Sequence, residues 1–449
     1  MHRVMTDVLL IVLLMANVLL LLSMLDKNVN TKRKLRKRKK DSELPFHSKR
    51  KRVLWPRLVR SLGPTEFEKH HRVSFDLFNK LHSKLEPHIS TNVKYARKTC
   101  CRGKVSHVDS RSRLSMTLKH LAGSKTQDIQ HTHGVSRSTV VEAIASTFDA
   151  IITEFGIPKF PFDNEQELMK LADGFKKKST GDLFTNVVGA FDGYLLRISK
   201  RCIGSKSGVK DPSKYYCRKG FYAINCQVSC DANRRITSLS MLSPGAVPDR
   251  LAHLKGSMHR SIETGCLPQK YHFVGDNAYP SSNQMLTPCT RQQLRDDIHG
   301  WKDNYNFYLS QLRINIECCF GMLINKFPIL QAALLTPKLG TACKTFMVCC
   351  ILHNLCIDER LARCDDGVVS FPTRQRLAQT DEASSNTQLT EGDFELVDTV
   401  DETTTEELQN LRENVGPQNV DRDVDTLSVR EKMIRMIAAK GYVRPKIRS

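Results

Sequence analysis

The sequence predicts an α/β protein, with an all-α helix-turn-helix region followed by a domain of strands covered by helices. Three observations carry this prediction. Apolar residues recur at helical spacing through residues 61–157, runs rich in β-branched residues begin at about residue 183, and a helical stripe returns near residue 312. The chain has 449 residues and is 40% apolar, so it can bury a sizeable core.

Charge is distributed unevenly along the chain. The 69 Lys and Arg exceed the 47 Asp and Glu, giving a net charge of +22 that favours polyanionic partners, nucleic acid first and an anionic membrane surface second. Residues 27–60 hold 15 Lys and Arg with 2 acids, whereas residues 381–425 hold 14 acids with 2 Arg. Because blocks of like charge repel themselves, we expect a basic flexible arm over 27–60 and an acidic disordered linker over 359–426.

The N-terminal segment is strongly apolar. Residues 8–25 form a run of 18 residues, and as a helix it would extend about 27 Å, just enough to cross a bilayer. Residues 1–26 are therefore a possible membrane anchor, and the alternatives are an apolar helix packed elsewhere or an upstream start that the working protein does not use. The basic runs at 31–40 and 49–52 instead predict nuclear import or a phosphate-binding arm.

Two early helices are predicted from apolar stripes. The first has Ser74 as a cap and the stripe Leu77, Phe78, Leu81 and Leu85, and the second has Leu114, Leu118 and Leu121.

A helix-turn-helix follows. Thr126 is expected to cap a short helix, Gly134 to end it in the left-handed conformation, and Ser136 to cap the next helix. The last helix has one apolar side and leaves Arg137 and Ser138 exposed at its start, where a recognition helix contacts bases and phosphates. An ordinary helical hairpin is the alternative. The apolar side consists of Val140, Ile144, Phe148 and Ile151.

Acidic residues accompany the predicted strands. The strands cover 186–198, 222–231, 235–242 and 271–276, with a hairpin turn at 231–234. Asp192 lies near the middle of the first strand, and Asp276 ends the fourth. Glu317 lies on a helix predicted over 309–326, at the margin of its stripe of Leu312, Ile316 and Leu323, and Arg313 one turn earlier can pair with it or with a phosphate.

Such acids suit a particular chemistry. Cleavage of a phosphodiester is assisted by two cations about 3.5–4 Å apart, and Mg²⁺ or Mn²⁺ prefers carboxylate oxygens. The 15 cysteines are odd in number and several lie in apolar runs, so we expect them reduced. No C-x-x-C pair occurs among them, which gives a structural zinc site little support. A single Asp at a strand end is more often a turn cap or a salt-bridge partner, so the acids alone do not establish a metal site.

Five motifs in order resemble the PIF/Harbinger-type DDE transposases and the nucleases derived from them. Together with the upstream run LWPRLVRSLGPTEFEKHHRVS and the helix-turn-helix, they span about residues 53–358. The resemblance implies an RNase H-like catalytic domain over 183–358, a mixed sheet with flanking helices. The motifs are GAFDGYLLRI, SPGAVPD, VGDNAYP, YNFYLSQLRINIECCFGMLINKFPIL and ILHNLCI.

The resemblance also implies roles for individual residues. Asp192, Asp276 and Glu317 would be the catalytic DDE triad and would bind divalent Mg²⁺ or Mn²⁺, with Asp249 as a fourth metal-side carboxylate. DNA contacts would come from Lys214, Arg218 and Lys219 in the basic loop before the second strand.

The chain departs from the family pattern at Tyr194, Pro248 and Ala278, where Thr, His and Gly are common. No departure removes a carboxylate, although the rate and the metal geometry are left open. His353 and Asn354 are expected to pack and cap rather than to catalyse.

We therefore predict a nuclear DDE-type endonuclease that hydrolyses DNA by two-metal-ion catalysis. The alternatives are a domesticated, catalytically silent nuclear DNA-binding protein and a membrane-anchored scaffold that uses residues 8–25. The resemblance implies a helper protein with a Myb-like domain, and a homo-oligomer is left open. Residues 427–449 predict an amphipathic helix and a basic tail that could dock back or bind a partner.

Overall fold

The computed structural model describes residues 52–91, 108–204, 209–365 and 427–445. The apolar run 8–25, the basic runs 31–40 and 49–51, and the acidic block 381–425 lie outside the described residues, so the predictions made for them stay predictions. The described residues from Val53 onward belong to one compact unit.

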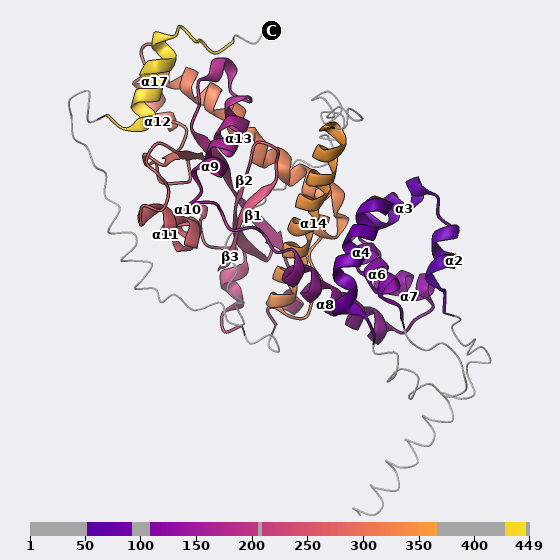
Figure 1. Ribbon diagram of the computed structural model, residues 1–449. Helices are drawn as coiled ribbons and strands as arrows, with labels where there is room; N and C mark the ends of the chain where they lie inside the picture. Colours follow the sequence, from indigo (N-terminus) through magenta and orange to yellow (C-terminus); the bar gives the residue numbers. More distant parts are fainter. Residues whose placement is uncertain (1–51, 92–107, 205–208, 366–426, 446–449) are drawn as a thin grey trace, which may run out of the picture. The chain divides into compact units, whose positions relative to one another are not determined.

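Six helices form the described N-terminal region, and both predicted stripes are buried in it. Ser74 caps as predicted, because its hydroxyl accepts a hydrogen bond of 3.0 Å from the Leu77 amide. The helices are α2 (Trp55–Arg60), α3 (Pro64–His71), α4 (Phe75–Ile89), α6 (Ser110–Leu121), α7 (Thr126–His133) and α8 (Arg137–Glu154) (Figure 1).

Helices α7 and α8 are joined by the predicted tight turn. Gly134 is left-handed with φ 63°, and the Ser136 hydroxyl accepts from the Thr139 amide at 3.2 Å. The prediction for Thr126 was wrong, because the extended residue before the helix is Lys125 and Thr126 is already helical. Arg137 and Ser138 are exposed at the start of α8. Their contact with DNA stays a prediction.

The sheet contains the four predicted strands and a short fifth strand, in the order β3-β2-β1-β4-β5. Pairing is antiparallel between β1 and β2 and between β2 and β3, and parallel between β1 and β4 and between β4 and β5. This mixed sheet with flanking helices confirms the predicted α/β, RNase H-like fold class. The strands are β1 (Val187–Arg197), β2 (Ala223–Cys230), β3 (Ile236–Pro244), β4 (His272–Val274) and β5 (Met285–Leu286).

Helices cover the two faces of the sheet. On one face α9 (Glu165–Lys176), α10 (Asp249–Lys255) and α11 (Ser257–Glu263) pack, and we call it the α10 face. On the other lie α13 (Trp301–Lys326) and α14 (Leu339–Asp365), and we call it the α13 face (Figure 1). Short elements connect these helices and strands: η1 (Thr180–Asp182), η2 (Lys200–Cys202), η3 (Pro212–Tyr215), α12 (Arg291–Arg295) and η4 (Pro328–Gln331).

Ring contacts show to which face of the sheet the side chains of β1 point. Phe191 lies 5.1 Å from the ring of His253 on α10, whereas Tyr194 stacks on Phe346 of α14 at 5.5 Å. Because successive side chains of a strand alternate, Asp192 belongs to the α13 face and Gly193 to the α10 face.

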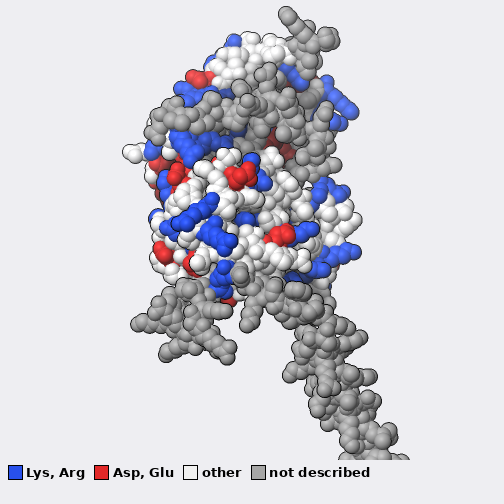
Figure 2. All heavy atoms as spheres, turned by 90° about the vertical axis from the view of Figure 1, so that its right-hand side faces the viewer, with Lys and Arg blue, Asp and Glu red and all other residues white. Residues whose placement is uncertain are grey.

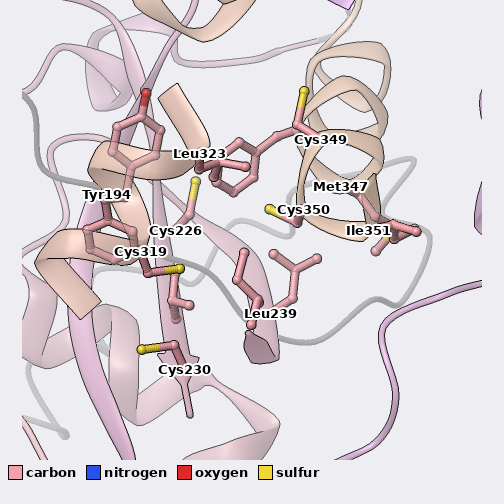
Figure 3. Close-up of a cluster of buried hydrophobic side chains, with 14 of the residues drawn as sticks. Tyr194, Cys226, Cys230, Leu239, Cys319, Leu323, Met347, Cys349, Cys350 and Ile351 are labelled. Atoms are coloured by element: carbon pink, nitrogen blue, oxygen red, sulfur yellow. The ribbon is translucent and has the colours of Figure 1, made fainter. Parts of the chain in front are cut away.

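The core beneath α13 and α14 is rich in sulfur. Figure 3 shows Cys349 and Cys350 of α14 near Cys226 of β2 and Cys319 of α13. Twelve cysteines of the described segments are free, and the reduced state stays a prediction. Helix α14 is long and apolar enough to cross a membrane, but 67% of its most apolar window is buried, as in a core helix of a folded domain.

His353 and Asn354 of α14 hold the β2–β3 hairpin. His353 Nε2 lies 2.8 Å from the Arg234 carbonyl oxygen. The Asn354 side chain accepts from the Ile236 amide and donates to its carbonyl, both at 2.8 Å. These contacts agree with the predicted packing and capping roles.

The C-terminal helix docks back on the domain. Helix α17 (Val429–Ala439) packs on α13 and buries Ile434 and Ile437. The Tyr308 hydroxyl of α13 donates to the Val443 carbonyl at 2.9 Å. Helix α13 begins at Trp301, earlier than predicted, because the Asp297 carboxylate caps the amides of residues 301–303.

Candidate active site

Asp192 lies in β1, and Asp276 follows the end of β4, the parallel neighbour of β1. Ala190 of β1 pairs with Val274 of β4, and each aspartate follows its strand partner by two residues. Residues two apart share a face, and neighbouring strands lie about 4.8 Å apart. Asp192 therefore lies on the α13 face, and Asp276 comes near enough for its charge to raise the pKa of Asp192.

Asp192 is held in an unusual environment. Its side chain is only 8% exposed, and its Oδ1 accepts a hydrogen bond of 2.7 Å from the Gly193 amide. Burial raises the pKa of Asp192 to about 8, and the charges of Asp276 and Glu317 add to the effect while Arg313 opposes it. The hydrogen bond from the Gly193 amide favours the charged form, and a nearby cation would favour it further.

Asp276 is half-buried at the end of β4. Its Oδ1 accepts from the Ala278 amide at 2.8 Å, so the turn after the strand fixes the carboxylate. Burial raises the pKa of Asp276, the Asp249 charge adds to this shift, and the cations of Arg313 and Arg218 oppose it.

Glu317 completes the α13 side of the site. Arg313 Nη2 lies 2.7 Å from Glu317 Oε1, one helical turn away. The same guanidinium acts electrostatically on Asp192 and Asp276. Arg313 is therefore the cation common to all three carboxylates.

The spacing of the acids bears on their predicted role in metal binding, which stays a prediction. Within the described residues, no three side chains of His, Cys, Asp or Glu are close enough together to hold one ion as they stand. Like charges repel without a cation between them, and Arg313 neutralises Glu317 instead.

Asp249 lies on the other face of the sheet. It is the first residue of α10, and a Cβ placed on Gly193 would come within 2.6 Å of its Oδ1. Asn225 Nδ2 donates to Asp249 Oδ1 at 3.0 Å, and Arg218 Nη2 lies 3.9 Å from Oδ2. The predicted role of Asp249 as a metal ligand stays a prediction.

The predicted basic residues surround this aspartate. Lys214 lies in η3, where its carbonyl accepts from the Ala246 amide at 2.9 Å. Arg218 and Lys219 form the turn before β2, closed by a 3.0 Å bond from the Gly220 amide to the Cys217 carbonyl. Lys214 and Arg218 are exposed.

Two polar residues of β2 near the site were not identified from the sequence. Asn225 and Gln227 are 2% and 3% exposed, and Gln227 accepts a hydrogen bond of 2.9 Å from the Tyr279 hydroxyl. With Ser229 they are polar residues at spacing two along β2, and residues at this spacing share one face. That spacing was the signal that could have identified them.

Comparison with known proteins agrees with this architecture. Residues 191–354 match the DDE superfamily endonuclease family, and the matched segment runs from β1 to α14. This segment is therefore similar to DDE superfamily domains. No solved structure matches.

The similar curated proteins carry a more specific name. The chain is 23% identical over 229 residues to "Putative nuclease HARBI1" of Mus musculus, covering 50% of this chain and 61% of that protein. It is 23% identical to the Rattus norvegicus protein of that name and 22% identical to the Homo sapiens one, each over 231 residues, 50% of this chain and 61% of the relative. The match thus spans about three fifths of those relatives, and the predicted resemblance to Harbinger-derived nucleases is confirmed.

Proposed function

We propose that the chain is a transposase-derived endonuclease that hydrolyses DNA phosphodiester bonds with two divalent cations, Mg²⁺ or Mn²⁺. The observation that carries this proposal is the register of β1 and β4, which brings Asp192 and Asp276 together facing the helix of Glu317. The match to a DDE superfamily endonuclease supports it.

The side chains fit hard divalent cations. All the donors are carboxylate oxygens, and the charge of Arg313 does not offset the effect of burial on the pKa of Asp192. Bound cations would stabilise charge on the attacking and leaving oxygens. The Arg313 guanidinium, which already acts on all three carboxylates, would also attract a phosphate.

The direct test is cleavage of duplex DNA by the full chain. We expect nicking with Mn²⁺ or Mg²⁺, none in EDTA, and a loss of about 100-fold or more in Glu317→Gln, because the amide keeps the shape but not the charge. DNA binding should survive in this variant. Full cleavage by Glu317→Gln would exclude Glu317 from the site.

A catalytically silent DNA-binding protein is the second candidate. The Arg313–Glu317 ion pair favours it, since a neutralised glutamate is a weaker metal ligand. This candidate predicts salt-sensitive DNA binding with no cleavage under any divalent cation. It also predicts no Mn²⁺ binding in the absence of DNA.

Nuclear DNA would be the substrate, contacted by the loop before β2 and by the start of α8. The face seen in Figure 2 carries Lys and Arg in several separate groups with acids between them. This pattern favours contacts at several points on the DNA rather than one continuous basic track. A Myb-like helper protein and a homo-oligomer remain proposals.

Removing basic side chains of the loop before β2 should change the salt dependence of DNA binding. We expect Lys214→Ala with Arg218→Ala to weaken binding and to lower the slope of log K against log salt by about 2, because each phosphate contact contributes about 0.9. Lys432→Ala with Lys440→Ala on α17 is the matched control and should leave the slope unchanged. Equal slopes for both double variants would place the DNA elsewhere.

A further inference from the structure

We propose that a row of hydrogen-bonded side chains on the α10 face, which we call the positioning chain, holds Asp192 and Asp276 in position from the opposite face of the sheet. It runs from Asp249 through Asn225 and Gln227 to Tyr279. Asn225 Nδ2 donates to Asp249 Oδ1 at 3.0 Å and to the Val247 carbonyl at 2.7 Å. Gln227 Nε2 donates to Asn225 Oδ1 at 3.2 Å, and the Tyr279 hydroxyl donates to Gln227 Oε1 at 2.9 Å.

These polar groups are buried, so they would destabilise the fold if they did not form hydrogen bonds with one another. Tyr279 is 4% exposed, and its ring packs near Phe191 and His253. Buried polar atoms without partners destabilise a fold, so each member of the chain restricts the next. The chain therefore ties α10, β2 and the turn after β4 into one fixed arrangement.

Two glycines allow the positioning chain to lie close to Asp192 and Asp276. Gly193 follows Asp192, and a Cβ there would lie 2.6 Å from Asp249 Oδ1. Gly275 precedes Asp276, and a Cβ there would lie 2.9 Å from Tyr279 Cδ2. Each aspartate thus has beside it a glycine whose missing side chain admits one end of the chain.

The Tyr279 end acts on Asp276. The Tyr279 amide donates to the Asp276 carbonyl at 3.3 Å, closing the turn in which the Ala278 amide holds Asp276 Oδ1. With its ring against Gly275 and its hydroxyl on Gln227, Tyr279 prevents this turn from opening. Gln227 is also the partner of Gly193 in the pairing of β1 with β2. Gln227 is therefore linked to Asp192 through Gly193 and to Asp276 through Tyr279.

This arrangement gives Asp249 a different role from that of a metal ligand. Its carboxylate accepts the Asn225 amide on the face opposite Asp192. We assign Asp249, Asn225, Gln227 and Tyr279 as positioning residues, which act on metal and substrate through Asp192 and Asp276.

The inference rests on the proposed metal-dependent function, and Tyr279→Phe in the full chain tests it. The substitution removes the hydroxyl but keeps the ring. We expect Mn²⁺ titrated into DNA-free protein to bind about 10-fold more weakly, and kcat for DNA cleavage to fall by about 10-fold with KM unchanged. Hydrogen exchange of the amides of residues 276–279 should accelerate.

Tyr271→Phe is the matched control. Tyr271 is 2% exposed, precedes the same strand β4, and donates its hydroxyl to Glu165 Oε1 at 2.8 Å. Tyr271→Phe loses the same hydroxyl oxygen, but at the start of β4 rather than beside Asp276. We therefore expect its Mn²⁺ affinity and the hydrogen exchange of residues 276–279 to match the wild type. Equal effects of the two substitutions would reduce Tyr279 to a general stability role and overturn the proposal.

Asp249→Asn separates positioning from metal binding. An asparagine still accepts from Asn225, so we expect it to retain wild-type Mn²⁺ affinity. Loss of Mn²⁺ binding in Asp249→Asn, with no effect of Tyr279→Phe, would make Asp249 a ligand and overturn the proposal. If the wild type binds no Mn²⁺, the proposed function fails, and unchanged exchange at residues 276–279 in Tyr279→Phe would then overturn the positioning chain separately.

Discussion

Replacing Asp192 by Asn is expected to reduce DNA cleavage on the order of 1000-fold and to stabilise the metal-free protein at neutral pH. The loss of activity follows because Asp192 is the most buried of the three carboxylates and adjoins Asp276. An amide at this position keeps the hydrogen bond from the Gly193 amide but supplies no charge for a cation.

The gain in stability follows from the same burial. The pKa of Asp192 is raised from 3.8 to about 8 in the folded protein, so the folded state binds more protons than the unfolded state between these values. Stability is therefore lost as the pH rises through this window, and Asn removes the loss, on the order of 4 kcal/mol at pH 7. Urea unfolding in EDTA measures it.

Asp231→Asn is the control for this prediction. Asp231 is also 8% exposed, and burial raises its pKa to about 6, but it caps the β2–β3 turn through the amides of Asn233 and Arg235. Its variant should cleave DNA at the wild-type rate. Added Mn²⁺ should stabilise the wild type and Asp231→Asn but not Asp192→Asn. Wild-type cleavage by Asp192→Asn would remove Asp192 from the catalytic triad.

Mild acid is expected to unfold the protein through its buried histidines. Burial lowers the pKa of His71 and His253 to about 3, and that of His120 and His133 to about 4. Two of them share Ser115, whose hydroxyl lies 2.8 Å from His71 Nε2 and 3.1 Å from His133 Nε2. Protonation would place two charges at this buried hydroxyl.

The direction of the pH effect follows from these shifts. An unfolded histidine takes up a proton near pH 6.5, whereas the buried ones remain neutral down to about pH 3 or 4. Stability is thus fully present above pH 6.5 and decreases as the pH falls from there. Each such histidine contributes a slope of about 1.4 kcal/mol per pH unit, so the four together would cost about 5 kcal/mol per unit.

Urea midpoints measured between pH 7.5 and pH 5 test this expectation. His120→Leu should flatten the pH dependence by one proton, and its stability should hold because His120 Nδ1 is buried without a partner in the described protein. His131→Gln, at an exposed position of α7, is the control and should leave the slope unchanged. A wild-type midpoint independent of pH over this range would contradict the prediction.

Prediction from sequence succeeded where the signal is local. The β1 run, the β2–β3 hairpin and helices α4, α6, α8 and α17 were all predicted from apolar spacing and caps. Strand β5 was missed because two residues carry no periodicity. Helices α10, α11 and α12 were missed because each is a short element of 5 to 7 residues. Thr126 was misassigned because its neighbour Lys125 takes the extended conformation.

The amino-acid sequence by itself determined which segments become strands and helices and which acids follow the strands, since side-chain period and turn chemistry act between near neighbours. Only the tertiary structure decided what those acids meet. Asp192 faces α13 while Asp249 lies across the sheet beside Gly193, and Arg313 pairs with Glu317. What a side chain meets on its face of the sheet depends on which helix packs there. That packing forms only when the whole chain folds.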